Sequence, residues 1–163
     1  MNILEPEIKV ISEKKIIGME IKMSFEDNST STSELWKSFM PNRNKIVYNI
    51  NSDFLSVQIF NSSLKYDDFR PDTIFKKWAA VEVENFNKIP KGMKTMVIPK
   101  GKYAVFIHQG LPNTFHKTVQ YIFETWLPSS VYRIDNRPHF EVLSKDYSPN
   151  DPKAEETVWI PII

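Results

Sequence analysis

The chain has 163 residues, enough for one compact domain or for two small halves that share a core. Its 21 basic and 20 acidic residues give a formal net charge of +1, which provides no long-range attraction for nucleic acid or an anionic membrane. Cysteine is absent, so disulfides, thiolate catalysis and zinc–sulfur sites are excluded. We therefore expect a single domain over 1–163 that binds neither DNA nor a membrane directly.

The first residues contain no basic region followed by a long apolar run, so we expect no signal peptide. No stretch approaches the 18 or so uninterrupted apolar residues that span a bilayer. A cytoplasmic protein is the resulting expectation, and the glycosylation sequons at Asn28 and Asn61 are then chance matches.

The first half has the pattern of a strand, a helix and two strands. Apolar residues alternate with polar or small ones over 17–23, which predicts a strand with one buried face. Ser31 and Glu34 have the spacing of a capping box, and Pro41 should stop the helix that follows. The predicted elements are strands over 17–23, 54–60 and 78–84 and a helix over 34–40.

The second half repeats that order. Pro99-Lys100-Gly101 suits a tight turn between two strands, and Asn113 is the predicted N-cap of a helix that ends at Pro128. The apolar stripe of this helix is wide enough to pack on a sheet. The stripe contains Phe115, Val119, Ile122, Phe123 and Trp126, and the predicted strands are 96–98, 103–108, 138–143 and 157–163.

The repeated order predicts an α+β fold of two βαββ modules, one over about 6–84 and the other over about 93–163. A module of about 80 residues buries too little surface alone, so the two should pack together. We expect antiparallel sheets, two main helices and a pseudo-twofold axis. A pseudo-twofold pair would place a central cleft along the seam, a favoured position for a ligand.

The strand predicted at 138–143 carries a carboxylate between apolar neighbours. If Phe140 and Val142 face the helices, Glu141 faces the seam together with His139. Glu141 is then either an ordinary solvent-facing residue or a partly buried carboxylate that accepts a cation. In the second case burial raises its pKa and a bound cation lowers it, so ligand binding and proton release are linked.

Aromatic residues make up 13 % of the chain, so some could line a cavity. Trp78, Tyr103, Tyr132 and Trp159 fall at or near element ends, and each desolvated ring face attracts a cation by about 0.5–2 kcal/mol. Core packing is the alternative for each of them. The aromatic residues of the helical stripes, Trp36, Phe123 and Trp126, are expected in the core.

Other chemistries find little support. The histidines His108, His116 and His139 lack metal-ligand spacing, so we expect no metal. No nucleophile elbow or nucleotide-binding motif is present, so no cofactor is expected. Basic pairs such as Lys76-Lys77 are interpreted as solvated faces.

Several runs, taken in order, resemble the GyrI-like small-molecule-binding domain, the AraC-type effector-binding domain of multidrug-sensing transcription regulators. The runs are 98–106 (IPKGKYAVF), Gly110, 126–132 (WLPSSVY), Phe140-Glu141 and 159–162 (WIPI).

The resemblance implies two strand-helix-strand-strand modules around a pseudo-twofold axis, with a central glutamate that contacts cationic or aromatic ligands. That glutamate matches Glu141, Tyr132 lies in a matching motif, and pocket aromatics would fall near Trp78, Tyr103 and Trp159. Leu143 stands where many members have an aromatic residue. The regulators' helix-turn-helix domain is absent from the chain, so a transcriptional role would need a separate regulator as partner.

These features lead to the hypothesis of a stand-alone protein that senses or sequesters a lipophilic cationic or aromatic compound. The residues predicted to bind it are Glu141, Tyr132, Tyr103, Trp78, Trp159 and His139. Enzymatic activity stays open: a GyrI-like hydrolase of strained cyclopropanoid electrophiles would use Glu141 as base and Tyr132 or Tyr103 as hydrogen-bond donor. Further alternatives are a gyrase-inhibitor-like interaction module and a haem protein with His108 or His139 as axial ligand.

Overall fold

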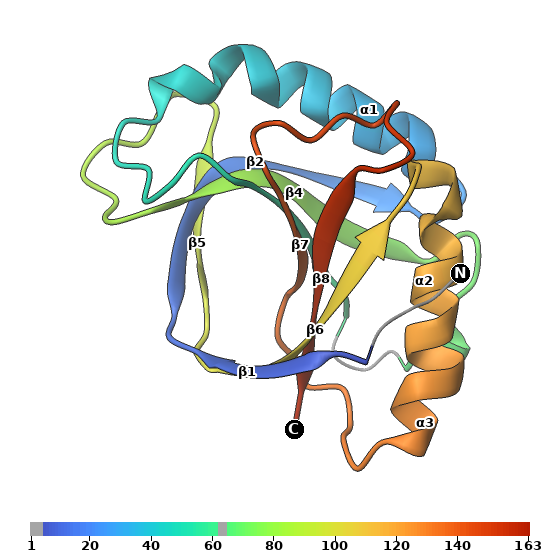
Figure 1. Ribbon diagram of the computed structural model, residues 1–163. Helices are drawn as coiled ribbons and strands as arrows, with labels where there is room; N and C mark the ends of the chain where they lie inside the picture. The colour runs from blue at the N-terminus through green and yellow to red at the C-terminus, as the bar shows by residue number, and fades with distance from the viewer. Residues whose placement is uncertain (1–4, 62–64) are drawn as a thin grey trace.

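The computed structural model describes residues 5–61 and 65–163. Within them, eight strands form one antiparallel sheet in the order β1-β6-β8-β7-β3-β4-β2-β5 (Figure 1). The elements in chain order are β1 (Glu7–Ile11), β2 (Lys14–Ser24), α1 (Asn28–Phe39), η1 (Met40–Lys45), β3 (Phe54–Ile59), η2 (Tyr66–Asp68), β4 (Ile74–Val83), β5 (Lys94–Ile98), β6 (Gly101–Gln109), η3 (Pro112–Thr114), α2 (Phe115–Tyr121), the π-helix η4 (Ile122–Trp126), α3 (Leu127–Ser129), β7 (His139–Leu143) and β8 (Glu155–Ile162).

The strand order is symmetric about the central β3–β7 pair. Counting outward from that pair gives β3, β4 and β2 on one side and β7, β8 and β6 on the other. Each side consists of a strand, a helix and two strands in chain order, so the predicted α+β fold is confirmed. The outermost strands are exchanged, because β1 precedes β2 but pairs with β6, and β5 precedes β6 but pairs with β2.

This exchange curls the sheet into a ring (Figure 1). The predicted turn at Pro99-Lys100 therefore exists as a corner and not as a hairpin, since β5 and β6 lie at distant positions in the sheet. At Gly18 the strands approach closely: a Cβ there would lie 2.1 Å from the Ala79 carbonyl oxygen. Side chains fill the inside of the ring. They are Ile16, Leu55, Val57, Trp78, Ala80, Ile98, Tyr103, Val105 and Phe140.

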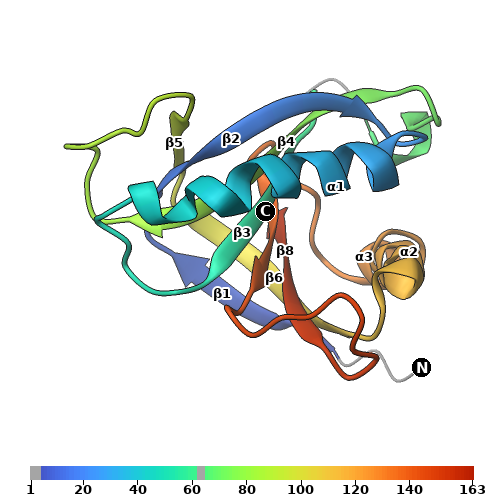
Figure 2. The same ribbon diagram turned by 90° about the horizontal axis from the view of Figure 1, so that it is seen from above.

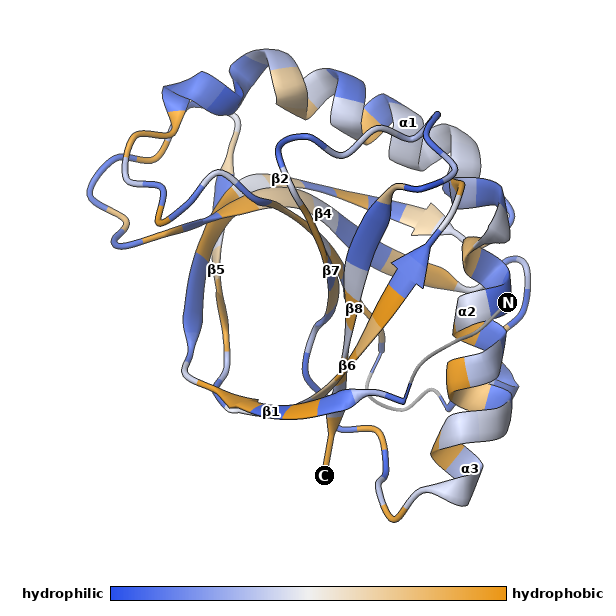
Figure 3. Ribbon diagram, viewed as in Figure 1, coloured by the Kyte–Doolittle hydropathy of each residue, from blue (hydrophilic) through white to orange (hydrophobic). Residues whose placement is uncertain are grey.

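Both helices lie on the outside of the ring (Figures 1 and 2). Helix α1 buries Leu35 and Phe39 against the outer face of β2 and β4. Ile122 and Trp126 pack in the same way on β6 and β8. Figure 3 shows apolar and polar residues alternating along α2, as expected of a helix with one buried side.

The first helix is longer than predicted. It begins at Asn28, so Ser31 and Glu34 lie inside it and form no capping box. Pro41 does not end the helical path, because it occupies the first turn of η1, where proline tolerates the missing N–H.

The second helix is less regular than predicted. Asn113 belongs to the short η3 turn, and α2 follows with Thr114 as its N-cap residue. A π-helical turn interrupts the helix at Ile122–Trp126, and Pro128 lies inside the final turn instead of after it. No helix among residues 5–61 and 65–163 is long and apolar enough to cross a lipid bilayer.

Candidate functional site

Glu141 lies on the outer face of the sheet, on the same side as the helices. Its neighbour Phe140 points into the ring core, which is the opposite of the expectation that Phe140 would face the helices. The seam between the modules is a pair of hydrogen-bonded strands with Ser56 directly opposite Glu141. A ligand of Glu141 would therefore lie over the outer face of the sheet and not between separated halves.

Four buried polar side chains lie near Glu141 on this face, and we call the five together the polar strip. They lie on neighbouring strands and each keeps 6 % to 9 % of its surface exposed. The Gln58 side-chain amide donates a hydrogen bond to Glu141 Oε1 at 3.0 Å and contacts Ser56 Oγ at 3.3 Å. The strip consists of Ser56, Gln58, Lys77, His139 and Glu141.

Burial perturbs the charged groups of the strip and of Glu156, which lies on the adjoining strand β8. Burial raises the pKa of Glu141 to about 7, while Lys77 and the Gln58 hydrogen bond oppose the rise. The pKa of Glu156 rises to about 8 through burial and the negative charge of Glu141. Burial lowers the pKa of Lys77, against the attraction of both carboxylates. The carboxyl groups of Glu141 and Glu156 therefore gain or lose their protons near neutral pH.

Aromatic rings border the strip at the His139 end. The imidazole lies edge-on to Phe60 at 5.0 Å and stacks on Phe123 at 6.3 Å between ring centroids. Phe123 also stacks on Tyr66, with 4.7 Å between ring centroids, and this contact links η2 to the π-helix η4. Burial and the charge of Arg137 lower the pKa of His139 to about 4, so the ring is neutral at pH 7.

Three predicted cage aromatics are not near Glu141, because they point into the ring core. Trp78 Nε1 donates to Glu20 at 2.7 Å, and Tyr103 Oη donates to the Pro138 carbonyl. Two of the rings already have cations from the chain itself: Arg137 lies 4.6 Å from the centroid of Tyr103, and Lys9 lies 5.6 Å from that of Trp159. Their expected attraction for cations is thus satisfied internally.

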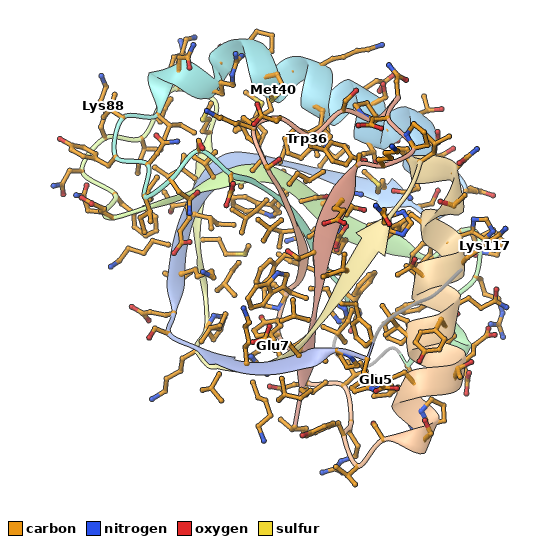
Figure 4. The ribbon with its side chains drawn as sticks, viewed as in Figure 1. Glu5, Glu7, Trp36, Met40, Lys88 and Lys117 are labelled. Carbon is orange, nitrogen blue, oxygen red and sulfur yellow. The ribbon has the colours of Figure 1, made fainter. Side chains whose placement is uncertain are left out.

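Tyr132 lies on a different flank, beside a cavity of about 440 Å³. Its ring stacks on Trp126, and Lys102 Nζ lies 5.5 Å from the centroid of the Tyr132 ring. Arg133, the next residue along the chain, forms backbone hydrogen bonds with Ile163, whereas Glu141 lies opposite Val158. Ile163 and Val158 are five residues apart, which is roughly 16 Å along an extended strand. The cavity is lined by Glu5, which Figure 4 labels, and by Pro6, Ile8, Tyr121, Trp126, Ser129, Ser130, Val131 and Tyr132.

The structure adds five residues that the sequence analysis did not select: Ser56, Gln58, Phe60, Lys77 and Glu156. The interpretation of Lys76-Lys77 as a solvated pair is wrong for Lys77, which is 8 % exposed. Period-two alternation could have found it, because Lys77 shares a face with Phe75 and Ala79 once the strand is extended toward Ile74.

The histidines considered for haem occupy different surroundings. His108 Nδ1 lies 2.7 Å from the Thr118 hydroxyl, and its Nε2 is buried without a hydrogen-bond partner. His139 is enclosed by rings, as described above. In the described part of the chain, no three His, Asp or Glu side chains gather in a way that could hold a metal ion.

A family model for the GyrI-like small molecule binding domain matches residues 4–163. The chain belongs to this family. GyrI-like membership agrees with the symmetric α+β sheet described above, and it makes this protein a small-molecule-binding domain related to the effector domains of transcription regulators.

One sequence relative and two solved structures of similar fold are compared with the chain. The transcriptional regulator BrlR of Pseudomonas aeruginosa is 26 % identical over 148 residues, which are 90 % of this chain and 51 % of BrlR. The chain thus spans about half the length of that regulator. SAV2435, solved bound to tetraphenylphosphonium, has a TM-score of 0.76 at 15 % identity and is covered over 98 % of this chain and 94 % of its own. EcmrR in complex with DNA has a TM-score of 0.68 at 11 % identity, covering 97 % and 57 %.

Proposed function

We propose that this GyrI-like domain captures a lipophilic organic cation over the polar strip, as a sensor or sequestering protein, with Glu141 as the counter-charge. The observation that carries the proposal is a carboxylate at the centre of the sheet with only 8 % of its surface exposed. Its hydrogen-bond donor is the neutral Gln58 amide, and among the described residues no cation lies within 4 Å of it. A buried carboxylate without a contacting cation gains stability from an organic cation that replaces water.

The aromatic border suits the apolar part of such a ligand. Phe60 and Phe123 flank the strip, and the intervening His139 is neutral, so it does not repel a cation. Aromatic faces add about 0.5–2 kcal/mol each when the cation is desolvated. SAV2435, which shares the fold, binds a cation of this class, tetraphenylphosphonium.

The experiment is calorimetric titration of the full chain with tetraphenylphosphonium, comparing wild type with Glu141→Gln. Glutamine keeps the shape and the acceptor for Gln58 but removes the charge. We expect the substitution to weaken binding at least tenfold, since one desolvated charge contact contributes about 1–3 kcal/mol.

Tetraphenylborate, which has the same shape and the opposite charge, is the matched ligand control. Its affinity for wild type should be lower, and Glu141→Gln should not weaken it. Glu7→Gln removes an exposed carboxylate on the edge strand β1 and should leave cation binding within twofold of wild type. Equal losses of both ligands in Glu141→Gln would refute the charge role.

The arrangement expected for hydrolysis is not assembled. Tyr103 lies inside the ring core, and Tyr132 lines the cavity beside Glu5, at the far end of β8 from Glu141. Neither hydroxyl is placed to work with Glu141 on one substrate, so binding is the function that the geometry supports best.

A further inference from the structure

Three charged side chains lie along a diagonal on the outer face of the sheet, with β3 between the first two, and we call them the charge triad. Lys77 comes from β4, Glu141 from β7 and Glu156 from β8. The strand register places Glu141 between the other two. On one side, Lys77 pairs with Gln58, which pairs with His139, two residues before Glu141. On the other side, Glu141 pairs with Val158, and Glu156 lies two residues before it.

The three groups of the triad interact electrostatically, although they form no direct ion pairs with one another. Lys77 interacts with both carboxylates, and the carboxylates repel each other. Within residues 5–61 and 65–163, none of the three is in an ion pair of 4 Å or less. The phenol of Tyr147, in the loop before β8, is a further titratable group that interacts with Glu156.

The charge count sets a limit on the ligand. Above the pKa values of the two carboxyl groups, about 7 for Glu141 and about 8 for Glu156, both are ionised, and with Lys77 protonated the triad carries one net negative charge. A ligand with one positive charge neutralises it, whereas a ligand with two leaves an uncompensated positive charge next to a buried ammonium group. Burying unbalanced charge in a low-dielectric site is strongly unfavourable.

We propose that Lys77 acts as a built-in counter-ion that restricts this site to organic cations with a single positive charge. Glu156, and not Glu141 alone, supplies the negative charge that remains for the ligand. The inference rests on the proposed capture of cations over the polar strip and specifies the class of ligand.

The test uses two aromatic cations of nearly equal shape. N-methyl-4-phenylpyridinium has one charge, and N,N′-dimethyl-4,4′-bipyridinium has two. Calorimetric titration of the full chain at pH 9, where both carboxyl groups are ionised, should give at least tenfold tighter binding of the monocation by wild type. In Lys77→Met the ratio should shift at least tenfold toward the dication, and Lys77→Gln provides a second variant in case the first folds poorly.

The double variant is the sharper test. Glu156→Gln alone leaves a neutral triad and should weaken the monocation at least tenfold even though Glu141 is intact. Adding Lys77→Met restores one net negative charge and should recover affinity to within threefold of wild type. A structural role for either residue would not produce this recovery, because two structural defects add instead of cancelling.

Lys76→Met is the matched control, since it removes the same charge from the adjacent exposed position. Its ligand ratio should stay within twofold of wild type. A ratio unchanged in both Lys77 variants, or a double variant no better than Glu156→Gln, would overturn the inference while leaving cation capture in place. If wild type bound neither these cations nor tetraphenylphosphonium, the proposed function itself would fail.

Discussion

The two faces of the central strands have opposite characters although they are made by alternating residues of the same segments. On the inner face, Phe140 and Val57 are completely buried among apolar side chains. On the outer face, the adjacent residues Glu141 and Ser56 are polar and keep a small exposed fraction. At the central strands, apolar side chains therefore fill the inside of the ring, and polar and charged side chains lie on the outer face between the two helices.

The comparison predicts that neighbouring residues respond very differently to substitution. Phe140→Ala opens a cavity in the ring core and should reduce the free energy of unfolding by roughly 3–5 kcal/mol. Glu141→Gln, one residue further along, should not lower it at pH 8, because the amide has no charge to bury. Urea denaturation of both variants checks this. Comparable losses would show that the outer face at Glu141 contributes as much to stability as the ring core does at Phe140.

The outer face should also make stability depend on pH. The folded-state pKa values of Glu141, about 7, and Glu156, about 8, exceed the ordinary value of 4.5 for a glutamate side chain. Their protonated forms therefore stabilise the fold fully below about pH 4.5, and this contribution is lost as the pH rises through 7 to 8. His139 acts in the other direction, since its pKa of about 4 makes its contribution complete above 6.5 and lost toward pH 4.

Between pH 6.5 and 8 the two carboxyl groups lose this contribution, which should lower the free energy of unfolding by about 2 kcal/mol. The double variant Glu141→Gln/Glu156→Gln should flatten the decline. Thermal or urea unfolding in a pH series measures it. A wild-type profile that rises over this interval would contradict the burial of these two groups.

Much of the fold follows from local patterns. Alternation over 17–23 and the stripe from Phe115 to Trp126 predicted a strand and a helix that the structure contains, and the repeated order predicted the module topology. The exchange of β1 and β5 was not predictable in this way, because pairing between distant strands has no local signature.

The candidate site was harder to predict. Alternation put His139 and Glu141 on one face, and the structure keeps them together. It could not say which face of the sheet lies inside the ring, so Trp78, Tyr103 and Trp159 were assigned to the wrong side relative to Glu141. Lys77 and Glu156 are far from Glu141 in the sequence, and only the pairing of their strands in the sheet brings them near it.

The most direct measurement of the central claim is a crystal structure of the protein soaked with tetraphenylarsonium, whose arsenic gives an anomalous signal. We predict a peak over the outer face of the sheet, with the phenyl groups against Phe60 or Phe123 and the carboxylate of Glu141 facing the arsonium centre. A peak confined to the cavity beside Tyr132 and Glu5, with none near Glu141, would contradict it.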